Sequence, residues 1–377
     1  MNKKITLFCV VFTGIVVLLS LGTTLSFAAS EIKVGILGPM TGPGSLMGQG
    51  QRDGAILAIE KFNAAGGYKG RKIGYIIMDD QAQPTLGVNA AKKLVYKDEV
   101  LAVIGTPNSP VCLATMKITQ EAKTPQIMFG VAAKITEMGN YWLIRITPSD
   151  QVMASNYVTF VVKDRKMKKI AIFHDSTDYG KGGRDGLEAK MKQMGMKPTL
   201  VESFNVGDKD FSAQLNKIKN ENVDGVFLWG LYVEGAQILT QAKQLGLTMP
   251  FMASSGVNQG AFMQLAGKAA EGLYVVTYFS LDNPAKSVQD FIKEFKKRFD
   301  YDPNPVAATA FDGTNLLLNA IKKVGVDRKK IMDELRSVKG YKGVAGLMQT
   351  DKVGQTGQSS IIMQVKDGKF KVIWSSD

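Results

Sequence analysis

Short apolar runs alternate with amphipathic segments from residue 31 onward, and this alternation predicts strands that are followed by helices. The first strand is expected at residues 32–37. After a Gly/Pro-rich loop, a helix is expected to run to the glycines at 66 and 67, which can supply a left-handed cap. This half of the chain is expected to contain further strands at 72–78, 101–104, 126–129 and 141–146, and helices at 84–96 and 110–123.

A second set of the same kind begins after Thr147-Pro148-Ser149. Strands are expected at 169–174, 199–204, 225–229, 251–253 and 273–279. Helices are expected up to Gly195, at 211–220 behind Asp210, and at 233–245, 288–299, 306–324 and 331–338. The tail predicts a hairpin of residues 360–365 and 370–374 with a two-residue turn. Because strand–helix alternation forms parallel sheets covered on both faces, we predict the α/β class with two doubly wound lobes.

Ligands of such sheets bind outside the carboxyl ends of the strands. Polar or Gly-rich loops follow six of the expected strands, and we expect them to converge on one crevice between the lobes. These loops are residues 38–48, 106–110, 129–133, 175–179, 230–233 and 254–258.

The segment at residues 101–123 combines an apolar strand, a polar turn and a helix that we expect to start at Pro110. Proline suits the first helical position because its missing N–H group would be unpaired there. Ser109 would then lie where backbone N–H groups point outward and the helix dipole is positive, which favours a carboxylate or a phosphate. The alternative is that Ser109 is only an N-cap residue.

With 377 residues, the chain is long enough for two domains. Its first residues have the pattern of a signal peptide, with two lysines, an apolar run from Ile5 to Leu21, and small residues before position 29. We expect export and cleavage after Ala28. The alternative is that the apolar run, which is long enough to cross a membrane, stays as an uncleaved anchor.

The formal net charge of +13 becomes +11 when Lys3 and Lys4 are removed with the signal peptide. Scattered lysines carry this charge, and no arginine-rich, aromatic-interleaved patch predicts nucleic-acid binding. Cys112 would be the one remaining cysteine, which excludes an intramolecular disulfide, and His174 is the one histidine, which excludes multi-histidine sites. We therefore expect no metal and no cofactor.

A dinucleotide-dependent enzyme is the nearest rival class, because a Gly-rich loop follows the first strand. The spacing does not fit, since neither Gly42 nor Gly48 begins a Gly-x-Gly-x-x-Gly motif. No P-loop lysine motif and no Gly-x-Ser-x-Gly elbow occurs in the sequence. No motif places a serine or cysteine beside His174 and Asp175, so we expect no enzymatic activity.

Several short motifs occur together in a characteristic order. They are Ile32-Lys-Val-Gly-Ile-Leu-Gly-Pro-Met-Thr-Gly, Phe62-Asn-Ala-Ala-Gly-Gly67 with Gly70, Asp79-Asp80 before Pro84, Val103-Ile-Gly, Ile170-Ala-Ile-Phe-His-Asp with Tyr179-Gly180, Asp210-Phe211, and Ala270-Glu271-Gly272. Through these motifs the whole mature chain resembles the leucine/isoleucine/valine-type periplasmic solute-binding proteins that feed ABC importers.

This resemblance implies a type I binding-protein fold, in which two lobes joined by three crossovers close on a ligand. The crossovers would fall near Ser149, Phe279 and Ser360. One lobe would then comprise residues 29–149 and 280–359, and the other residues 150–279 and 360–377. The resemblance also implies a monomer in the periplasm or outside the cell, whose partners are a small solute and ABC permease subunits.

In amino-acid binders of this family, one lobe holds the ligand carboxylate with a serine hydroxyl and backbone amides. The resemblance places this serine at Ser109, with Asn108 beside it, and the amide and carbonyl of the following loop at Gly130, Val131 and Ala132.

The second lobe of those proteins places a ring over the ligand, and this ring corresponds here to Tyr179. Other positions depart from the amino-acid binders. Ala132 stands where they have a threonine, Ser255 where they have a glutamate that pairs with the ligand ammonium, Leu231 (beside Tyr232) where they have a second aromatic residue, and Met47 where they have an aromatic residue in the first loop.

Without that glutamate, burying a ligand ammonium is costly, because an unpaired buried charge is expensive. The sequence therefore predicts a small carboxylate without an α-amino group, or one whose amine other residues hold. The alternative is an ordinary amino-acid site whose loops align one or two positions differently. A different class, a ligand-sensing domain that acts with a receptor rather than a transporter, fits the same sequence.

Overall fold

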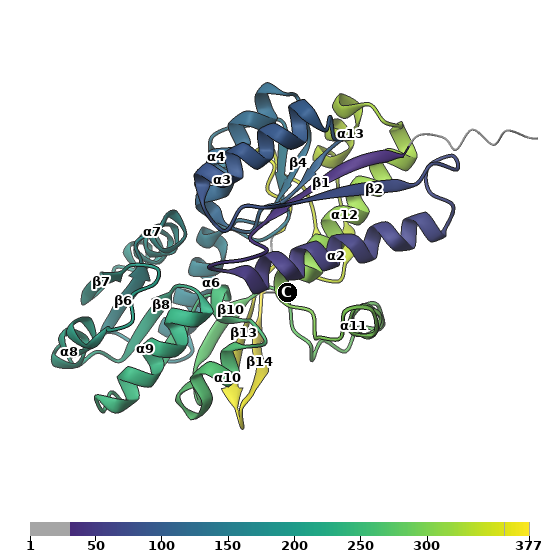
Figure 1. The fold of residues 1–377 in the computed structure, drawn as a ribbon. Helices are drawn as coiled ribbons and strands as arrows, with labels where there is room; N and C mark the ends of the chain where they lie inside the picture. The colour runs from purple at the N-terminus through teal and green to yellow at the C-terminus, as the bar shows by residue number, and fades with distance from the viewer. Residues whose placement is uncertain (1–30, 358, 377) are drawn as a thin grey trace, which may run out of the picture.

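The computed structural model of the chain describes residues 31–357 and 359–376. The predicted signal peptide and its cleavage site therefore lie outside the described residues. Two β-sheets organise the fold into two parts that lie side by side (Figure 1). We call residues 31–149 and 280–359 the first lobe and residues 150–279 and 360–376 the second lobe, a division that stays a prediction.

The sheet of the first lobe is parallel and has the order β2-β1-β3-β4-β5. Its strands are β1 (Ile32–Gly38), β2 (Ile73–Asp79), β3 (Val103–Ile104), β4 (Gln126–Met128) and β5 (Leu143–Arg145). Its helices are α2 (Ser45–Ala64), α3 (Pro84–Lys92) with the π-helical turn Lys93–Lys97, α4 (Ser109–Glu121), α5 (Lys134–Glu137), α11 (Lys286–Phe299), α12 (Pro305–Val324) and α13 (Arg328–Arg336).

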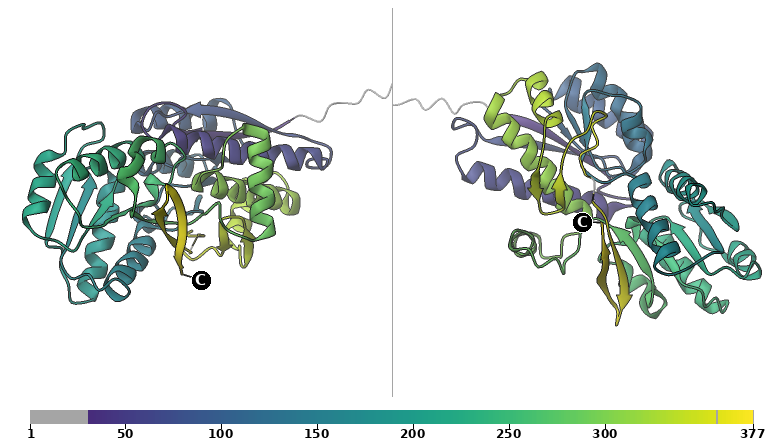
Figure 2. Two further views of the ribbon diagram at one scale, coloured as in Figure 1. Left: turned by 90° about the horizontal axis from the view of Figure 1, so that it is seen from below. Right: turned by 180° about the vertical axis from the view of Figure 1, so that it is seen from behind.

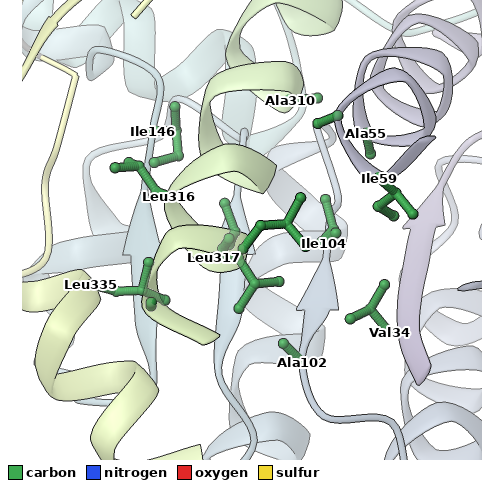
Figure 3. Packing of buried hydrophobic residues seen from close by; sticks show 14 of the residues in the cluster. Val34, Ala55, Ile59, Ala102, Ile104, Ile146, Ala310, Leu316, Leu317 and Leu335 are labelled. Atoms are coloured by element: carbon green, nitrogen blue, oxygen red, sulfur yellow. The ribbon is translucent and has the colours of Figure 1, made fainter. Parts of the chain in front are cut away.

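Helices cover both faces of this sheet, as the apolar strands require. Val34 and Ile36 of β1 are buried against α2 and α12, whereas Leu37 packs with α3 and the π-helical turn on the opposite face. Figure 3 shows Val34, Ile104 and Leu317 converging between the sheet and α12. Helix α12, which lies late in the sequence, thus completes the core of the first lobe.

The sheet of the second lobe has the order β14-β13-β10-β9-β8-β6-β7. Its strands are β6 (Ile170–Asp175), β7 (Leu200–Phe204), β8 (Gly225–Trp229), β9 (Phe251–Ala253), β10 (Tyr274–Thr277), β13 (Ile361–Lys366) and β14 (Lys369–Ser375). Its helices are α6 (Asp150–Lys163), α7 (Asp178–Gln193), α8 (Ser212–Asn220), α9 (Tyr232–Gln244) and α10 (Phe262–Ala266), with 3-10 turns at Ser255–Val257 and Gly267–Ala270.

The last two strands make this second sheet mixed rather than purely parallel, because β13 pairs antiparallel with both β10 and β14. Figure 2 shows this hairpin, in yellow, beside the second lobe. The predicted two-residue turn is confirmed: Asp367 and Gly368 have φ angles of 50° and 69°, as a type I′ turn requires. The predicted α/β class with two lobes is confirmed as well.

The chain passes three times between the two sheets, after β5, after β10 and before β13. The first and third passages are tied together near the predicted crossovers. Asn156 Nδ2 donates to Ser360 Oγ at 2.9 Å, and Arg145 Nε donates to Gln355 Oε1. No helix of the described residues is long and apolar enough to cross a membrane.

Besides the short helices α5 and α10, two elements are absent from the sequence prediction. Helix α6 buries Met153, Tyr157 and Val161 at a spacing of four residues. Its run of β-branched and aromatic residues has weak helix propensity, so tertiary packing decides its structure.

The second unpredicted element is a hairpin of β11 (Tyr341–Gly343) and β12 (Gly346–Met348). Asp312 of α12 holds its turn, since its carboxylate accepts from Val344 N at 3.0 Å and from Ala345 N at 2.8 Å. Burial raises the pKa of Asp312 to about 7.

Candidate ligand-binding site

A cavity of about 200 Å³ lies at the carboxyl ends of the strands, between the lobes. This volume is below the roughly 300–1,000 Å³ of pockets for drug-sized ligands, so the cavity suits a small solute. All six predicted loops contribute to its wall. The lining residues are Pro39, Pro43, Gly44, Met47, Gln81, Ala82, Gln83, Pro107, Asn108, Ser109, Pro110, Phe129, Val131, Asp175, Thr177, Tyr179, Val206, Leu231, Ser255, Gln259, Tyr278, Pro305 and Val306.

Six helices begin at this cavity, and all of them except α12 follow a strand whose carboxyl end faces it. The lining includes the N-cap residues of α2, α3, α4, α7 and α9 and the first residue of α12, namely Gly44, Gln83, Asn108, Thr177, Leu231 and Pro305. Helix N-termini carry partial positive charge and favour anions. Among the residues that the structure describes, no lysine, arginine or histidine lines the cavity, so the helices and polar groups supply the attraction for an anion.

Ser109 occupies a different helical position from the one expected. Helix α4 begins at Ser109, and its N-cap is Asn108, whose Oδ1 accepts from Val111 N at 3.2 Å. The alternative in which Ser109 is only a cap is therefore wrong. Its hydroxyl instead accepts from Ala132 N at 3.2 Å, and its side chain is buried at the cavity wall.

The loop that carries Ala132 is braced from behind by Arg145, a buried residue at the end of β5. Arg145 Nη1 donates to Val131 O at 3.1 Å and to Ala132 O at 2.6 Å. The backbone N–H of Asp150 donates to Val131 O at 2.8 Å. Burial lowers the pKa of Arg145 to about 10, which leaves the guanidinium charged at neutral pH.

Sequence reasoning missed Arg145. The available signal was an arginine inside an otherwise apolar strand, a residue type that is almost never fully buried without partners.

Tyr179 lines the cavity from the second lobe, at the start of α7. Its hydroxyl donates to Ser254 Oγ at 2.8 Å and accepts from Gly256 N at 3.1 Å. Burial raises the pKa of this phenol, so it stays protonated. Both hydroxyl contacts lie within the second lobe, which fixes the ring at the wall.

The remaining predicted site residues divide into two groups. Met47, Val131, Leu231 and Ser255 line the cavity, as do Asn108, Ser109 and Tyr179. Gly130, Ala132 and Tyr232 are not among the lining residues. Tyr232 is buried in the second-lobe core, and a Cβ at Gly130 would lie 2.6 Å from Cys112 Sγ, so that residue packs against α4.

Cys112 is a buried free cysteine, and burial raises the pKa of its thiol to about 12. A thiol with so high a pKa stays protonated and inert.

The segment Gln81-Ala82-Gln83 is a part of the wall that sequence reasoning missed. Gln81 and Ala82 both have left-handed backbone, with φ angles of 50° and 56°. The carboxylates before them hold this turn: Asp79 Oδ1 and Asp80 Oδ1 each accept, at 2.9 Å, from the N–H two residues on. The available signal was the Asp79-Asp80 pair at the end of the expected strand.

Asp175 is the one acidic residue of the cavity wall. Its Oδ1 accepts from Thr177 N at 2.9 Å, from Thr177 Oγ1 and from Gly180 N at 3.2 Å. Burial raises the pKa of Asp175, and its side chain is only 1% exposed. The carboxylate therefore organises the start of α7.

His174 is buried, and its Nδ1 lies 2.6 Å from Asp175 O. Among the described residues, no group of three or more His, Cys, Asp or Glu side chains could hold a metal ion.

Comparison with known proteins identifies relatives over most of the chain. A family model described as periplasmic binding protein matches residues 31–369. The leucine-, isoleucine-, valine-, threonine- and alanine-binding protein of Pseudomonas aeruginosa is 32% identical over 83% of this chain and 84% of its own length. A Leu/Ile/Val-binding protein homolog of Brucella suis is 30% identical over 96% of this chain and 98% of its own length.

Solved structures agree with this result. A leucine-binding protein from Thermotoga maritima has a TM-score of 0.85 at 28% identity and covers 91% of this chain and 98% of its own. A branched-chain amino acid transporter substrate-binding protein from Streptococcus pneumoniae was solved in complex with isoleucine. It has a TM-score of 0.85 at 26% identity, and the match covers 92% of this chain and 100% of that protein's chain. A solute-binding protein from R. palustris in complex with benzoate shares the fold at 20% identity. Its TM-score is 0.84, and the match covers 92% of this chain and 96% of that protein's chain.

Proposed function

The chain belongs to the periplasmic binding protein family, within its branched-chain amino acid type, and we propose that it delivers a small carboxylate without an α-amino group to an ABC importer. Proteins of this family are exported, bind solutes and are not enzymes, as the sequence predicts. The predicted cleavage after Ala28 is part of the proposal, and mass spectrometry of the exported protein tests it.

The charge distribution of the cavity carries the proposal. Six helix N-termini reach a wall that holds no basic side chain, and the one acid of that wall already accepts three hydrogen bonds. An anionic ligand gains from such a wall, because the positive ends of the helix dipoles face it. A buried ammonium lacks a dedicated acceptor there and pays its desolvation cost.

Ser255 supports the same ligand class. It lines the cavity on the second-lobe loop that follows β9, where the family resemblance places the ammonium-pairing glutamate. A serine hydroxyl is neutral, so it offsets little of the cost of burying a positive charge. We assign the carboxylate of the ligand to the first-lobe side, at Ser109 and the loop of residues 130–132, and the rest of the ligand to the side of Tyr179 and Ser255.

An amino acid is the second candidate ligand, because the relatives that share 30–32% identity are named for leucine, isoleucine and valine. The ligand-sensing role with a receptor remains the alternative to transport. Neighbouring genes for permease and ATPase subunits would favour transport.

A thermal-shift screen of the mature chain tests the ligand class, since a ligand stabilises in proportion to the logarithm of its concentration over Kd. The panel contains leucine, isoleucine, valine, the corresponding 2-oxo acids, short aliphatic acids and benzoate. We expect at least one acid without an amino group to raise the Tm more than every standard amino acid.

The variant Ser255→Glu serves as the matched change, because it restores an acceptor and should move the preference toward amino acids. Micromolar binding of leucine, isoleucine or valine to the wild type would overturn the assignment in favour of the ordinary amino-acid site.

A further inference from the structure

Gln259 separates two cavities at the boundary between the lobes. It follows the 3-10 turn Ser255–Val257 in the second lobe, is only 2% exposed, and lines the candidate binding cavity. It also lines a neighbouring cavity of about 400 Å³ that extends toward the turn of the β13–β14 hairpin. Neither the sequence motifs nor the family resemblance points to this residue.

The partner of Gln259 across the lobes is Asn304, the N-cap of α12 in the first lobe. Asn304 Oδ1 accepts from Ala307 N at 2.8 Å. Its Nδ2 donates to Leu46 O at 2.7 Å and to Gln259 Oε1 at 2.9 Å. Gly50 packs directly on this side chain, since a Cβ there would lie 2.4 Å from Asn304 Oδ1.

These contacts determine the orientation of both amides. The capping bond requires an oxygen at Asn304 Oδ1, and the Leu46 carbonyl requires a donor at Asn304 Nδ2. Asn304 therefore offers only an N–H group to Gln259. Gln259 must accept this hydrogen bond with its oxygen, and its NH2 group faces away from Asn304.

This NH2 group is left without an acceptor. Gln259 Nε2 is buried and has no hydrogen-bond partner among the described residues. A buried donor without an acceptor is costly, so native structures rarely retain one without a reason.

We propose that Gln259 determines ligand specificity by donating a hydrogen bond from Nε2 to a second oxygen of the ligand, separate from the carboxylate held by the first lobe. The proposal rests on the proposed function and refines it: the ligand class becomes acids with an additional oxo, hydroxyl or ether oxygen. An N–H donor repels an ammonium, so Gln259 selects against amino acids on the same side as Ser255.

The substitution Gln259→Glu tests this role with little change of shape. One carboxylate oxygen still accepts from Asn304, while the other replaces the NH2 donor with an acceptor. Gln259→Met removes both groups and serves as a second variant of similar length. Gln83→Glu adds a negative charge to the same cavity without touching the amide pair, and so controls for a general loss of affinity for anions.

The measurement is calorimetric binding of two matched pairs of acids, 4-methyl-2-oxopentanoate with 4-methylpentanoate and phenylglyoxylate with phenylacetate. Within each pair only the oxo oxygen differs, so a general effect of charge cancels in the ratio of the two Kd values. We expect the wild type to prefer an oxo acid at least tenfold. Gln259→Glu and Gln259→Met should abolish the preference, and Gln83→Glu should keep it.

Two failures are distinguishable. The role of Gln259 is overturned if the wild type binds acids without preferring the oxo member, or if the preference survives in Gln259→Glu. Either result leaves the proposed function intact. Wild type that binds amino acids and none of these acids overturns the proposed function, and the role of Gln259 with it.

Discussion

The two lobes build their sides of the cavity from different groups. The first-lobe side depends on backbone and caps: Ser109 at the start of α4, and a loop whose carbonyls are held by Arg145. The second-lobe side presents side chains, including Tyr179, Ser255 and Gln259. A wall made of backbone groups suits any carboxylate, whereas one substitution changes what a wall of side chains can bind. The second lobe should therefore set the ligand class.

The largest expected effect comes from removing the brace of the first-lobe side. Arg145→Met keeps a side chain of similar length but leaves Gln355 Oε1 and Thr136 Oγ1 without the guanidinium donor. Losing buried charge-assisted hydrogen bonds should lower the free energy of unfolding by about 3 kcal/mol or more, and should abolish ligand binding. Urea denaturation and calorimetry measure the two effects.

Arg336→Met is the matched control for this prediction. Arg336 also donates to backbone carbonyls, those of Leu143 and Lys352, but it is half-buried and distant from the loop of residues 130–132. The Arg336→Met variant should lose less stability than Arg145→Met and keep its affinity for the ligand. Equal losses in the two variants would contradict a special role for Arg145.

Ser109→Ala tests the ligand contact of the same side. A hydrogen bond to a charged group contributes about 1.5–3 kcal/mol, so affinity for the bound acid should fall roughly ten- to a hundredfold. Thermal stability should also fall, by about 1–3 kcal/mol, because the buried N–H group of Ala132 loses its acceptor while Asn108 still caps the helix.

Asn108→Ala should keep its affinity for the acid and lose about 1 kcal/mol of stability through the missing cap. Calorimetry and thermal melts of the two variants separate the roles. Unchanged affinity in Ser109→Ala would leave Ser109 as a structural link to Ala132.

On the second-lobe side, Tyr179→Phe removes the hydroxyl bonds to Ser254 and Gly256 while keeping the ring. Each lost bond should cost about 1 kcal/mol of stability, with affinity nearly retained. Tyr179→Ala also removes the ring, so affinity and the ligand-induced compaction seen by solution scattering should both fall. If Tyr179→Ala loses stability but binds like the wild type, the ring packs only on its own lobe.

The sequence predicts the place of the cavity better than the contacts that hold its wall. Alternating apolar runs locate the six strand-end loops, since burial of parallel strands leaves a strong local signal. The resemblance then leads to Ser109, although the cap assignment fails by one residue because Asn108 and Ser109 have similar capping preference.

Arg145 and Gln259 escape prediction for a different reason. Their roles depend on partners far along the chain: Arg145 reaches Gln355, and Gln259 reaches Asn304. No local periodicity encodes such contacts, so only the folded arrangement reveals them. Helix α6 was missed likewise, because packing against the second sheet overrides the weak propensity of its residues.

The last prediction concerns stability alone, at Asp150, where the two sides meet. Its N–H group donates to Val131 O in the first lobe, and a Cβ at Gly182 of α7 would lie 2.5 Å from its Oδ2. Both carboxylate oxygens are buried, and the Trp229 side chain offsets the effect of this burial on the pKa only in part. Burial raises the pKa of Asp150 to about 8, against the attraction of Arg145, and Asp175 and Asp185 raise it further.

A raised carboxyl pKa means that the folded state binds the proton more tightly than the unfolded state. The resulting stabilisation is present below the unfolded pKa of about 4 and is lost as the pH rises to about 8, with a slope of at most about 1.4 kcal/mol per pH unit. Asp150→Asn should remove this slope and stabilise the protein at pH 8. Burial also raises the pKa values of Asp312 and Asp80, to about 7 and about 6. These two residues still make stability depend on pH below those values in Asp150→Asn. Urea denaturation at pH 5, 7 and 8.5 measures the difference, and an unchanged slope between pH 7 and 8 in Asp150→Asn would place the titration elsewhere.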